Sequence, residues 1–286
     1  MFRKESTVRE TSNPILRSLP QREGGYAQYG TGMAGAANQV GFRTQAYGPP
    51  QTGVSRPLTI DDVVTKTGIT LGVLSVVAAI SYFLVGSNPG LAGPFTMFGA
   101  IGGLVLVLIA SFGRKQDSPA LVLSYAALEG LFLGGLSWVF GNLLVQGISA
   151  GALITQAILG TVGVFFGMLV VYKTGAIRVT PKFTRMLFAS MIGVLVLMLG
   201  SLVISLFTHS AGPLRDGGPL AIVFSLVVIV IAALSFLVDF DSADQLIRAG
   251  APEKAAWGIA LGLTVTLVWL YLEILRLLSY FYSSDR

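Results

Sequence analysis

The sequence predicts an all-α integral membrane protein with seven transmembrane helices. Its 286 residues are 53% hydrophobic and only 12% charged, which is about half the charged fraction of a typical soluble domain. A helix needs about 20 mostly apolar residues to cross a hydrocarbon core of roughly 30 Å. The apolar runs are continuous, whereas strands of a membrane barrel alternate over about 10 residues. Seven stretches are long enough: residues 68–85, 95–112, 119–145, 151–172, 186–207, 219–238 and 255–282.

The first and third helices have recognisable starting signals. Thr59 can cap the first helix, and Asp61 and Asp62 fall in its first turn, where the helix dipole favours negative charge. This structural role accounts for both aspartates. Ser118 followed by Pro119 combines a capping residue with a first-turn proline, so it predicts the start of the third helix.

Glycine pairs at four-residue spacing predict close packing between the spans. Small residues let helix backbones approach closely in lipid, where packing rather than hydrophobicity drives helix association. The pattern supports a compact bundle and says nothing about oligomerisation. Four spans carry such pairs: Gly99 and Gly103, Gly130 and Gly134, Gly163 and Gly167, and Gly258 and Gly262.

The distribution of basic residues predicts the orientation of the helices. Lys and Arg gather in the amino-terminal tail and in residues 114–115, 173–185 and 248–254, whereas residues 86–94 and 141–150 carry no charge. Basic connections remain on the cytoplasmic side. We therefore expect a multi-pass membrane protein with its amino terminus in the cytoplasm and its carboxyl terminus outside. The net charge of +5 follows from this topology, so the expected partner is the lipid bilayer and not a nucleic acid.

The chain divides into two regions of different composition. Residues 1–57 are rich in Gly, Gln, Ser, Thr and Pro and have few large aliphatic side chains, so they cannot bury enough apolar surface to fold alone. They also lack the apolar core of a signal peptide. We expect residues 1–57 to form a flexible cytoplasmic tail, which could bind a membrane protein partner. Residues 58–286 are expected to form the seven-helix transmembrane domain.

The residue inventory argues against an enzyme. The chain has no cysteine, which excludes disulfides and thiolate metal sites. Its single histidine, His209, follows the fifth span and is expected to be solvated. The sequence contains no Gly-x-Ser-x-Gly elbow, phosphate loop or His-Glu-x-x-His helix. We expect neither enzyme activity nor a bound cofactor.

Acidic residues inside or at the ends of the spans are the best indication of function. They are Glu129, Asp239, Asp241 and Glu273. A carboxylate in hydrocarbon costs at least ~2.5 kcal/mol on insertion scales, so it usually faces the bundle interior or a water-filled path. Several such groups indicate a protein that handles cations or protons.

Each of these acids also has a structural alternative. Glu129 could be a neutral acid that is hydrogen-bonded to a neighbour, because burial favours protonation. The two aspartates could mark the water boundary, and since residues two apart point in different directions, only one of them would face the bundle. Glu273 could pair with Arg276, three residues further along the same helix.

Three short motifs resemble the Bax inhibitor-1 family, also called the transmembrane Bax inhibitor motif proteins, in a bacterial form. The first is the basic turn Arg114-Lys115 ahead of Glu129-Gly130 in the third span. The second is Leu237-Val238-Asp239-Phe240-Asp241, with an aspartate at the cytoplasmic end of the sixth span. The third is Leu270-Tyr271-Leu272-Glu273, which is similar to Leu-Tyr-Leu-Asp in relatives. The similarity covers about residues 60–282 and leaves the tail without a counterpart.

The resemblance implies a specific fold and function. Six helices would surround a central seventh, and the protein would be a pH-sensitive calcium leak channel of the bacterial plasma (inner) membrane. An acid on the sixth helix and one on the seventh, here Asp239 and Glu273, would form the pH sensor and are the candidate metal ligands. Arg114, at the end of the second helix, would latch onto Asp239 on the cytoplasmic side. Two neighbouring carboxyls that share a proton titrate as one coupled group.

One spacing departs from the family pattern. Relatives separate the two acids by a shorter stretch than the one between Asp239 and Glu273. An alignment without a gap, counted from Asp241, places residues Thr264 to Thr266 at the second position. The Leu-Tyr-Leu match favours Glu273. If the alignment without a gap is the right one, Glu129 becomes the buried partner of the aspartate on the sixth helix.

Two functions of different classes are open at this point. The leading hypothesis is a pH-gated cation channel, with calcium favoured because hard oxygen ligands suit it. The alternative is a non-conducting regulatory membrane protein that binds a membrane protease or stress-response partner. Acids inside the spans favour the channel, and the long tail favours the regulator.

Overall fold

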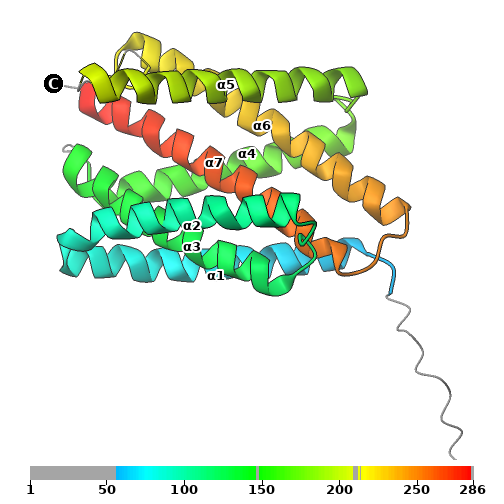
Figure 1. Ribbon diagram of the computed structural model, residues 1–286. Helices are drawn as coiled ribbons and strands as arrows, with labels where there is room; N and C mark the ends of the chain where they lie inside the picture. The colour runs from blue at the N-terminus through cyan, green and yellow to red at the C-terminus, as the bar shows by residue number, and fades with distance from the viewer. Residues whose placement is uncertain (1–55, 146–147, 209–211, 213, 285–286) are drawn as a thin grey trace, which may run out of the picture. The chain divides into compact units, whose positions relative to one another are not determined.

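Long helices make up nearly all of the chain that the computed structural model describes, which comprises residues 56–145, 148–208, 212 and 214–284 (Figure 1). These residues belong to one compact unit, Thr52–Arg286. His209 and the predicted tail, apart from Arg56 and Pro57, lie outside the described residues.

The helices match the seven predicted spans in order and approximate position. Seven helices of the described chain are long and apolar enough to cross a membrane, so the prediction of an all-α membrane protein with seven transmembrane helices is confirmed. A short 3-10 turn, η2 (Pro89–Leu91), precedes the second helix, and a π turn, η3 (Phe140–Leu144), extends the third. The long helices are α1 (Ile60–Ser87), α2 (Ala92–Phe112), α3 (Pro119–Val139), α4 (Ala150–Thr174), α5 (Pro181–Thr208), α6 (Pro219–Arg248) and α7 (Ala255–Ser284).

The start of α1 confirms the capping signal in the sequence. The Thr59 hydroxyl accepts a hydrogen bond from the Asp62 backbone N–H at 3.4 Å, and the Asp62 carboxylate accepts one from the Thr59 backbone N–H at 3.0 Å. This reciprocal capping box satisfies two backbone donors that the first turn of a helix leaves free.

The sixth helix is longer than the sequence predicts. The apolar run suggests an end at residue 238, but α6 continues to Arg248. Phe240 and Ala243 extend its apolar face and pack in the core, and burial of such a face stabilises a helix more than intrinsic propensity does. Asp239 and Asp241 therefore lie within the helix and not at its end.

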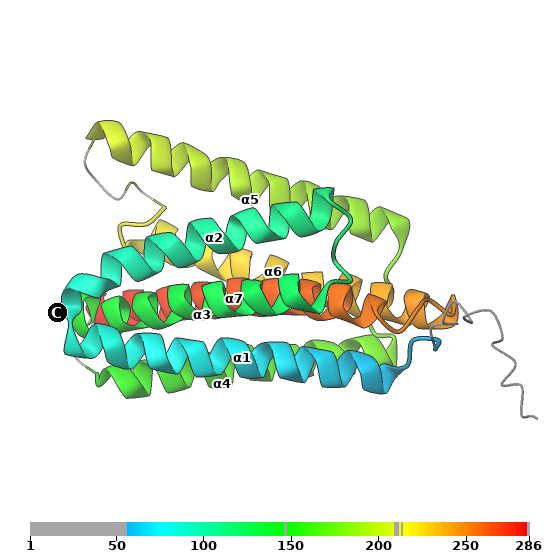
Figure 2. The same cartoon turned by 60° about the horizontal axis from the view of Figure 1, so that its bottom comes forward.

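The seventh helix is the most enclosed one. Of the 18 residues in the most apolar stretch of α7, 67% are buried. The corresponding share is 44% in α3 and in α6, and it is 22% or less in α1, α2, α4 and α5. It packs against α1, α3, α4 and α6. Helix α5 packs on α6 and lies at one side of the unit, away from α1 and α4 (Figure 2). The prediction that six helices surround a central seventh is therefore not confirmed.

Two of the predicted glycine pairs form close helix contacts. A Cβ atom added at Gly134 would fall on the backbone carbonyl oxygen of Ala78 in α1, and one added at Gly99 would lie 2.6 Å from the backbone carbonyl oxygen of Leu128 in α3. Only glycine permits such backbone approaches. Open space surrounds the Cβ positions of Gly163 and Gly167, so the expected close contact is absent at that pair.

Candidate functional site

Asp239 lies at the contact between α6 and α7. Thr266 of α7 donates its hydroxyl hydrogen to Asp239 Oδ2 at 2.8 Å. Thr266 is buried and Asp239 is half-buried. Gly262, one turn before Thr266, has no side chain, and a Cβ atom there would lie 3.9 Å from Asp239 Oδ1. On the α7 side, a hydroxyl and a glycine therefore border this carboxylate.

Asp239 has no cationic partner among the residues that the structure describes. The ion pairs within the described part of the chain do not include this residue. Asp241, two positions later, instead accepts an exposed hydrogen bond from Gln245 Nε2 at 2.6 Å. The two aspartates therefore point in different directions, as the sequence predicts, and Asp239 is the one that faces α7.

Glu129 occupies a separate position between α2 and α3. Its carboxylate is hydrogen-bonded to Tyr125, one turn earlier in α3, and Tyr125 is buried. Glu129 Oε1 lies 2.8 Å from the place that a Cβ atom would take at Gly103 of α2, so this glycine makes room for the acid. Glu129 Oε2 is buried and has no hydrogen-bond partner among the described residues. The bundle thus encloses a second carboxyl group that is not joined to Asp239.

Glu273 forms an ion pair within α7. Arg276 Nη1 donates a hydrogen bond to Glu273 Oε1 at 2.7 Å, so the pair that the i,i+3 spacing permits is present. Glu273 is only 1% exposed, and the charge of Arg215, in the connection before α6, also acts on this carboxylate. Glu273 Oε1 is therefore paired, whereas Oε2 is buried and has no hydrogen-bond partner among the described residues.

The structure does not bring Asp239 and Glu273 together. Thr266 occupies the place beside Asp239, which agrees with the alignment without a gap and not with the Leu-Tyr-Leu match. Glu273 lies about two turns further along α7. The expected pair is absent, both as a pH sensor and as a set of metal ligands, because each acid has its own partner. Within the described ranges, no three His, Cys, Asp or Glu side chains gather where a metal ion could bind.

Arg114 does not latch onto Asp239. It follows the end of α2 at an exposed position with a φ of 50°, in the left-handed region that residues other than glycine rarely adopt. It takes part in none of the ion pairs of the described chain. A different pair ties this loop to the start of α7, where Lys254 Nζ lies 4.0 Å from Asp117 Oδ2.

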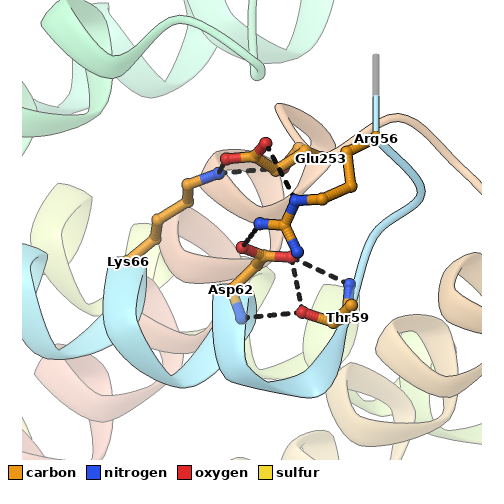
Figure 3. Close-up of polar contacts among 5 residues, drawn as sticks. All are labelled: Arg56, Thr59, Asp62, Lys66 and Glu253. Atoms are coloured by element: carbon orange, nitrogen blue, oxygen red, sulfur yellow. Dashed lines mark hydrogen bonds and ion pairs between the residues drawn. The ribbon is translucent and has the colours of Figure 1, made fainter. Parts of the chain in front are cut away.

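A second charged cluster joins the start of α1 to the loop between α6 and α7. We call it the α1–α7 clasp, and it consists of Arg56, Thr59, Asp62, Lys66 and Glu253 (Figure 3). Lys66 Nζ donates to Glu253 Oε1 at 3.1 Å and to the Glu253 backbone carbonyl at 3.0 Å. Arg56 Nη2 lies 2.6 Å from Asp62 Oδ1, and Arg56 Nε lies 3.6 Å from Glu253 Oε2. Both acids of the clasp therefore have cationic partners.

Backbone hydrogen bonds support the clasp. The Leu58 N–H donates to the Ala251 carbonyl at 2.8 Å, and the Glu253 N–H donates to the Arg56 carbonyl at 2.9 Å. Pro57 and Pro252 form an antiparallel bridge between these two bonds. The chain ahead of α1 is thus fixed to the loop that connects the helix of Asp239 to the helix of Thr266.

The clasp as a whole could not be predicted from the sequence. One half has a local signal, because Lys66 follows Asp62 by one helical turn and lies on the same face of α1. Glu253, however, lies 187 positions after Lys66. No spacing rule connects residues so far apart, so only the tertiary structure identifies Glu253 as the partner.

Comparisons with known proteins point to one family. A protein of Chlamydia muridarum (strain MoPn / Nigg), described as an uncharacterized protein, is 34% identical over 98 residues. That match covers 33% of this chain and 39% of the relative. The family model described as Bax inhibitor 1 like matches residues 13–283. Because this match includes most of the tail, the expectation that the tail has no counterpart in the family is wrong. Since the match spans nearly the whole chain, the protein belongs to the Bax inhibitor 1 like family.

Proposed function

We propose that this membrane protein is a pH-sensitive cation leak channel that conducts calcium, with Asp239 as its titrating group. The contact between Asp239 and Thr266 carries the proposal. It places an acid that has no cationic partner in the described chain against the most enclosed helix of the bundle. Ionisable residues inside transmembrane segments are costly, and they mark ion and proton pathways.

The chemistry around Asp239 suits a hard cation. The Thr266 hydroxyl that donates to Asp239 also lies 3.2 Å from the Gly262 backbone carbonyl oxygen. The α6 carboxylate therefore meets the Thr266 hydroxyl of α7, and the Gly262 carbonyl lies beside that hydroxyl. Carboxylate and carbonyl oxygens are ligands that calcium takes in proteins. Ionised Asp239 attracts a cation and protonated Asp239 does not, so cation flux depends on pH.

Thr266 determines the form of the expected pH response. Two acids that share a proton titrate in two coupled steps, whereas one isolated acid titrates in a single step. Asp239 contacts a threonine, and Glu273 is paired with Arg276. Glu129, which likewise has no ion pair in the described chain, is hydrogen-bonded to Tyr125 and is not joined to Asp239. The proposed sensor is therefore a single carboxyl group.

We also propose that the amino terminus faces the cytoplasm of a bacterial inner membrane. The basic connections at alternate ends of the helices support this orientation. A reporter fused at residue 1 or between Lys173 and Lys182 should then read cytoplasmic, and a reporter fused after Arg286 should read external. A cytoplasmic signal from the fusion after Arg286 would contradict the proposed topology.

Calcium flux into liposomes tests the channel and its sensor together. The purified full chain should conduct calcium, and the flux should fall as the pH is lowered, because protonation removes the negative charge of the Asp239 carboxylate. Asp239→Asn should remove this dependence on pH. Asp241→Asn is the matched control, since Asp241 faces away from α7, and its pH profile should equal that of the parent.

The regulatory alternative gives a different result in the same assay. A non-conducting regulator would pass no calcium at any pH, and Asp239→Asn would change nothing. Binding of a membrane protease or stress-response partner would then be sought with a chain lacking residues 1–55. In that case, deletion of the tail should reduce recovery of the partner while the helical bundle remains folded.

A further inference from the structure

A groove between α1 and α4 is not used by the proposed channel. It has a volume of about 490 Å³ and a floor made by α3 and α7, including Leu133 and Tyr271. Seven of its lining residues are exposed, so the groove is open to the surroundings of the bundle: Ser75, Ala79, Phe83, Gly151, Thr155, Ile158 and Val162. Its volume lies in the range of small-molecule sites, roughly 300–1,000 Å³.

The length and direction of the groove match one leaflet of a bilayer. Its lining runs from Leu71 to Phe83 along α1 and from Gly151 to Val162 along α4, which corresponds to about 18 Å and about 16 Å of helix. Half of the hydrocarbon core is ~15 Å thick. These segments are the second half of α1 and the first half of α4, so both lie toward the same membrane face. The groove therefore runs parallel to the acyl chains of that leaflet.

Most polar side chains of the groove already have hydrogen-bond partners within the protein. Ser137 and Tyr271 are hydrogen-bonded to each other at 2.7 Å. Thr155 and Thr161 donate to backbone carbonyls of their own helix, at 2.7 Å and 2.8 Å. Most of the other lining side chains are aliphatic or aromatic. An occupant that makes no hydrogen bonds fits this lining better than one that needs them.

The outer faces beside the groove are apolar as well. Val76 and Ile80 of α1 are 59% and 52% exposed, and Leu159 of α4 is 65% exposed. Large apolar side chains on the outside of a membrane bundle contact lipid. The same hydrocarbon therefore borders the open side of the groove.

We propose that the groove between α1 and α4 binds one acyl chain of a membrane phospholipid. The chain enters from the side and lies along the helices over Leu133 and Tyr271, in the leaflet that contains the end of α1. The orientation, length and lining of the groove each favour this occupant over water or a polar solute. The site is separate from Asp239 and does not depend on calcium conduction.

Native mass spectrometry of the full chain tests the site. The protein is reconstituted in phosphatidylcholine vesicles, extracted in detergent and stripped of lipid in graded steps. We expect one phosphatidylcholine molecule per chain to persist after the others are lost. The groove variant is Ala79→Phe with Gly151→Phe. Both positions line the groove, and open space surrounds the Cβ position of Gly151.

A matched variant controls for the added bulk. Ile80→Phe with Gly163→Phe places the same side chains on the same two helices outside the groove, and open space also surrounds the Cβ position of Gly163. The groove variant should retain phosphatidylcholine roughly tenfold less than the parent, and the control should retain it like the parent. Both variants should keep the helical circular dichroism of the parent. Equal retention by the two variants, retention of a free fatty acid alone, or the absence of any persistent lipid on the parent would each overturn the proposal.

Discussion

The α1–α7 clasp and the Asp239 site place acids at helix contacts in opposite ways. In the clasp, Lys66 and Arg56 approach the acids Glu253 and Asp62 at 3.1 Å and 2.6 Å. At the α6–α7 contact, Asp239 has a threonine hydroxyl and no cation among the described residues. Both regions fix one helix to another, but only the clasp compensates its negative charge.

This difference separates a structural use of charge from a functional one. A compensated acid has little reason to change its protonation state, because its cationic partner stabilises the ionised form. An acid held only by a hydroxyl can change its charge without leaving a cation unpaired. Position in a span does not by itself decide which use an acid has, since Glu273 lies inside α7 and its Oε1 is paired with Arg276.

The largest expected effect is on the compensated acid inside the membrane. Arg276→Met leaves Glu273 buried without its nearest cation, and removing one member of a buried pair costs about 3–5 kcal/mol. Because the charge of Arg215 still acts on Glu273, the loss of unfolding free energy should lie toward the lower end of this range. Thermal unfolding in detergent, followed by circular dichroism, measures the loss. Adding Glu273→Gln should recover part of it, and a double variant less stable than the single one would show that Glu273 is not the group left unpaired.

A smaller loss is expected in the clasp. Lys66→Met removes two hydrogen bonds to Glu253 and should lower the free energy of unfolding by about 1–2 kcal/mol, because the Glu253 side chain is partly exposed to solvent. The pH dependence of calcium flux should not change. Lys115→Met is the control, because Lys115 is exposed and belongs to no ion pair of the described chain. A changed pH profile in Lys66→Met would show that the clasp takes part in sensing.

The donor to Asp239 should set the midpoint of the pH response. Thr266→Val removes a hydrogen bond that favours the ionised carboxylate, so the midpoint of the flux titration should move to higher pH, by about one pH unit for a bond of about 1.4 kcal/mol. Thr264→Val is the control, because the Thr264 hydroxyl donates to the Ala260 carbonyl of its own helix at 2.7 Å. A shift in Thr264→Val equal to that in Thr266→Val would contradict the assignment of Thr266.

The smallest effect is expected at the exposed end of the clasp. The Arg56 side chain is 55% exposed, and exposed ion pairs contribute little to stability. Asp62 also keeps two hydrogen bonds from Thr59, at 2.6 Å and 3.0 Å. Arg56→Gln should therefore unfold within the scatter of repeated parent scans. A loss of unfolding free energy as large as that of Lys66→Met would mean that Arg56 stabilises the clasp as much as Lys66 does.

Features that depend on neighbouring residues could be predicted from the sequence. The spans follow from runs of apolar side chains, because a helix must be long enough to cross the hydrocarbon core. The Thr59–Asp62 capping box and the Glu273–Arg276 pair lie within one helical turn each, so their spacing already places the groups together. The end of α6 was less predictable, because the packing of Phe240 and Ala243 extends the helix beyond its apolar run.

By itself, the sequence determined the fold class, the membrane location, the local caps and the acids that could act in the spans. Only the tertiary structure decided which partner each acid has. The register of α6 against α7 places Thr266, and not Glu273, beside Asp239. The loop before α7 brings Glu253 to Lys66 of α1. These contacts depend on how whole helices pack, and packing in lipid is set by the fit of many small surfaces and not by the spacing of any one motif.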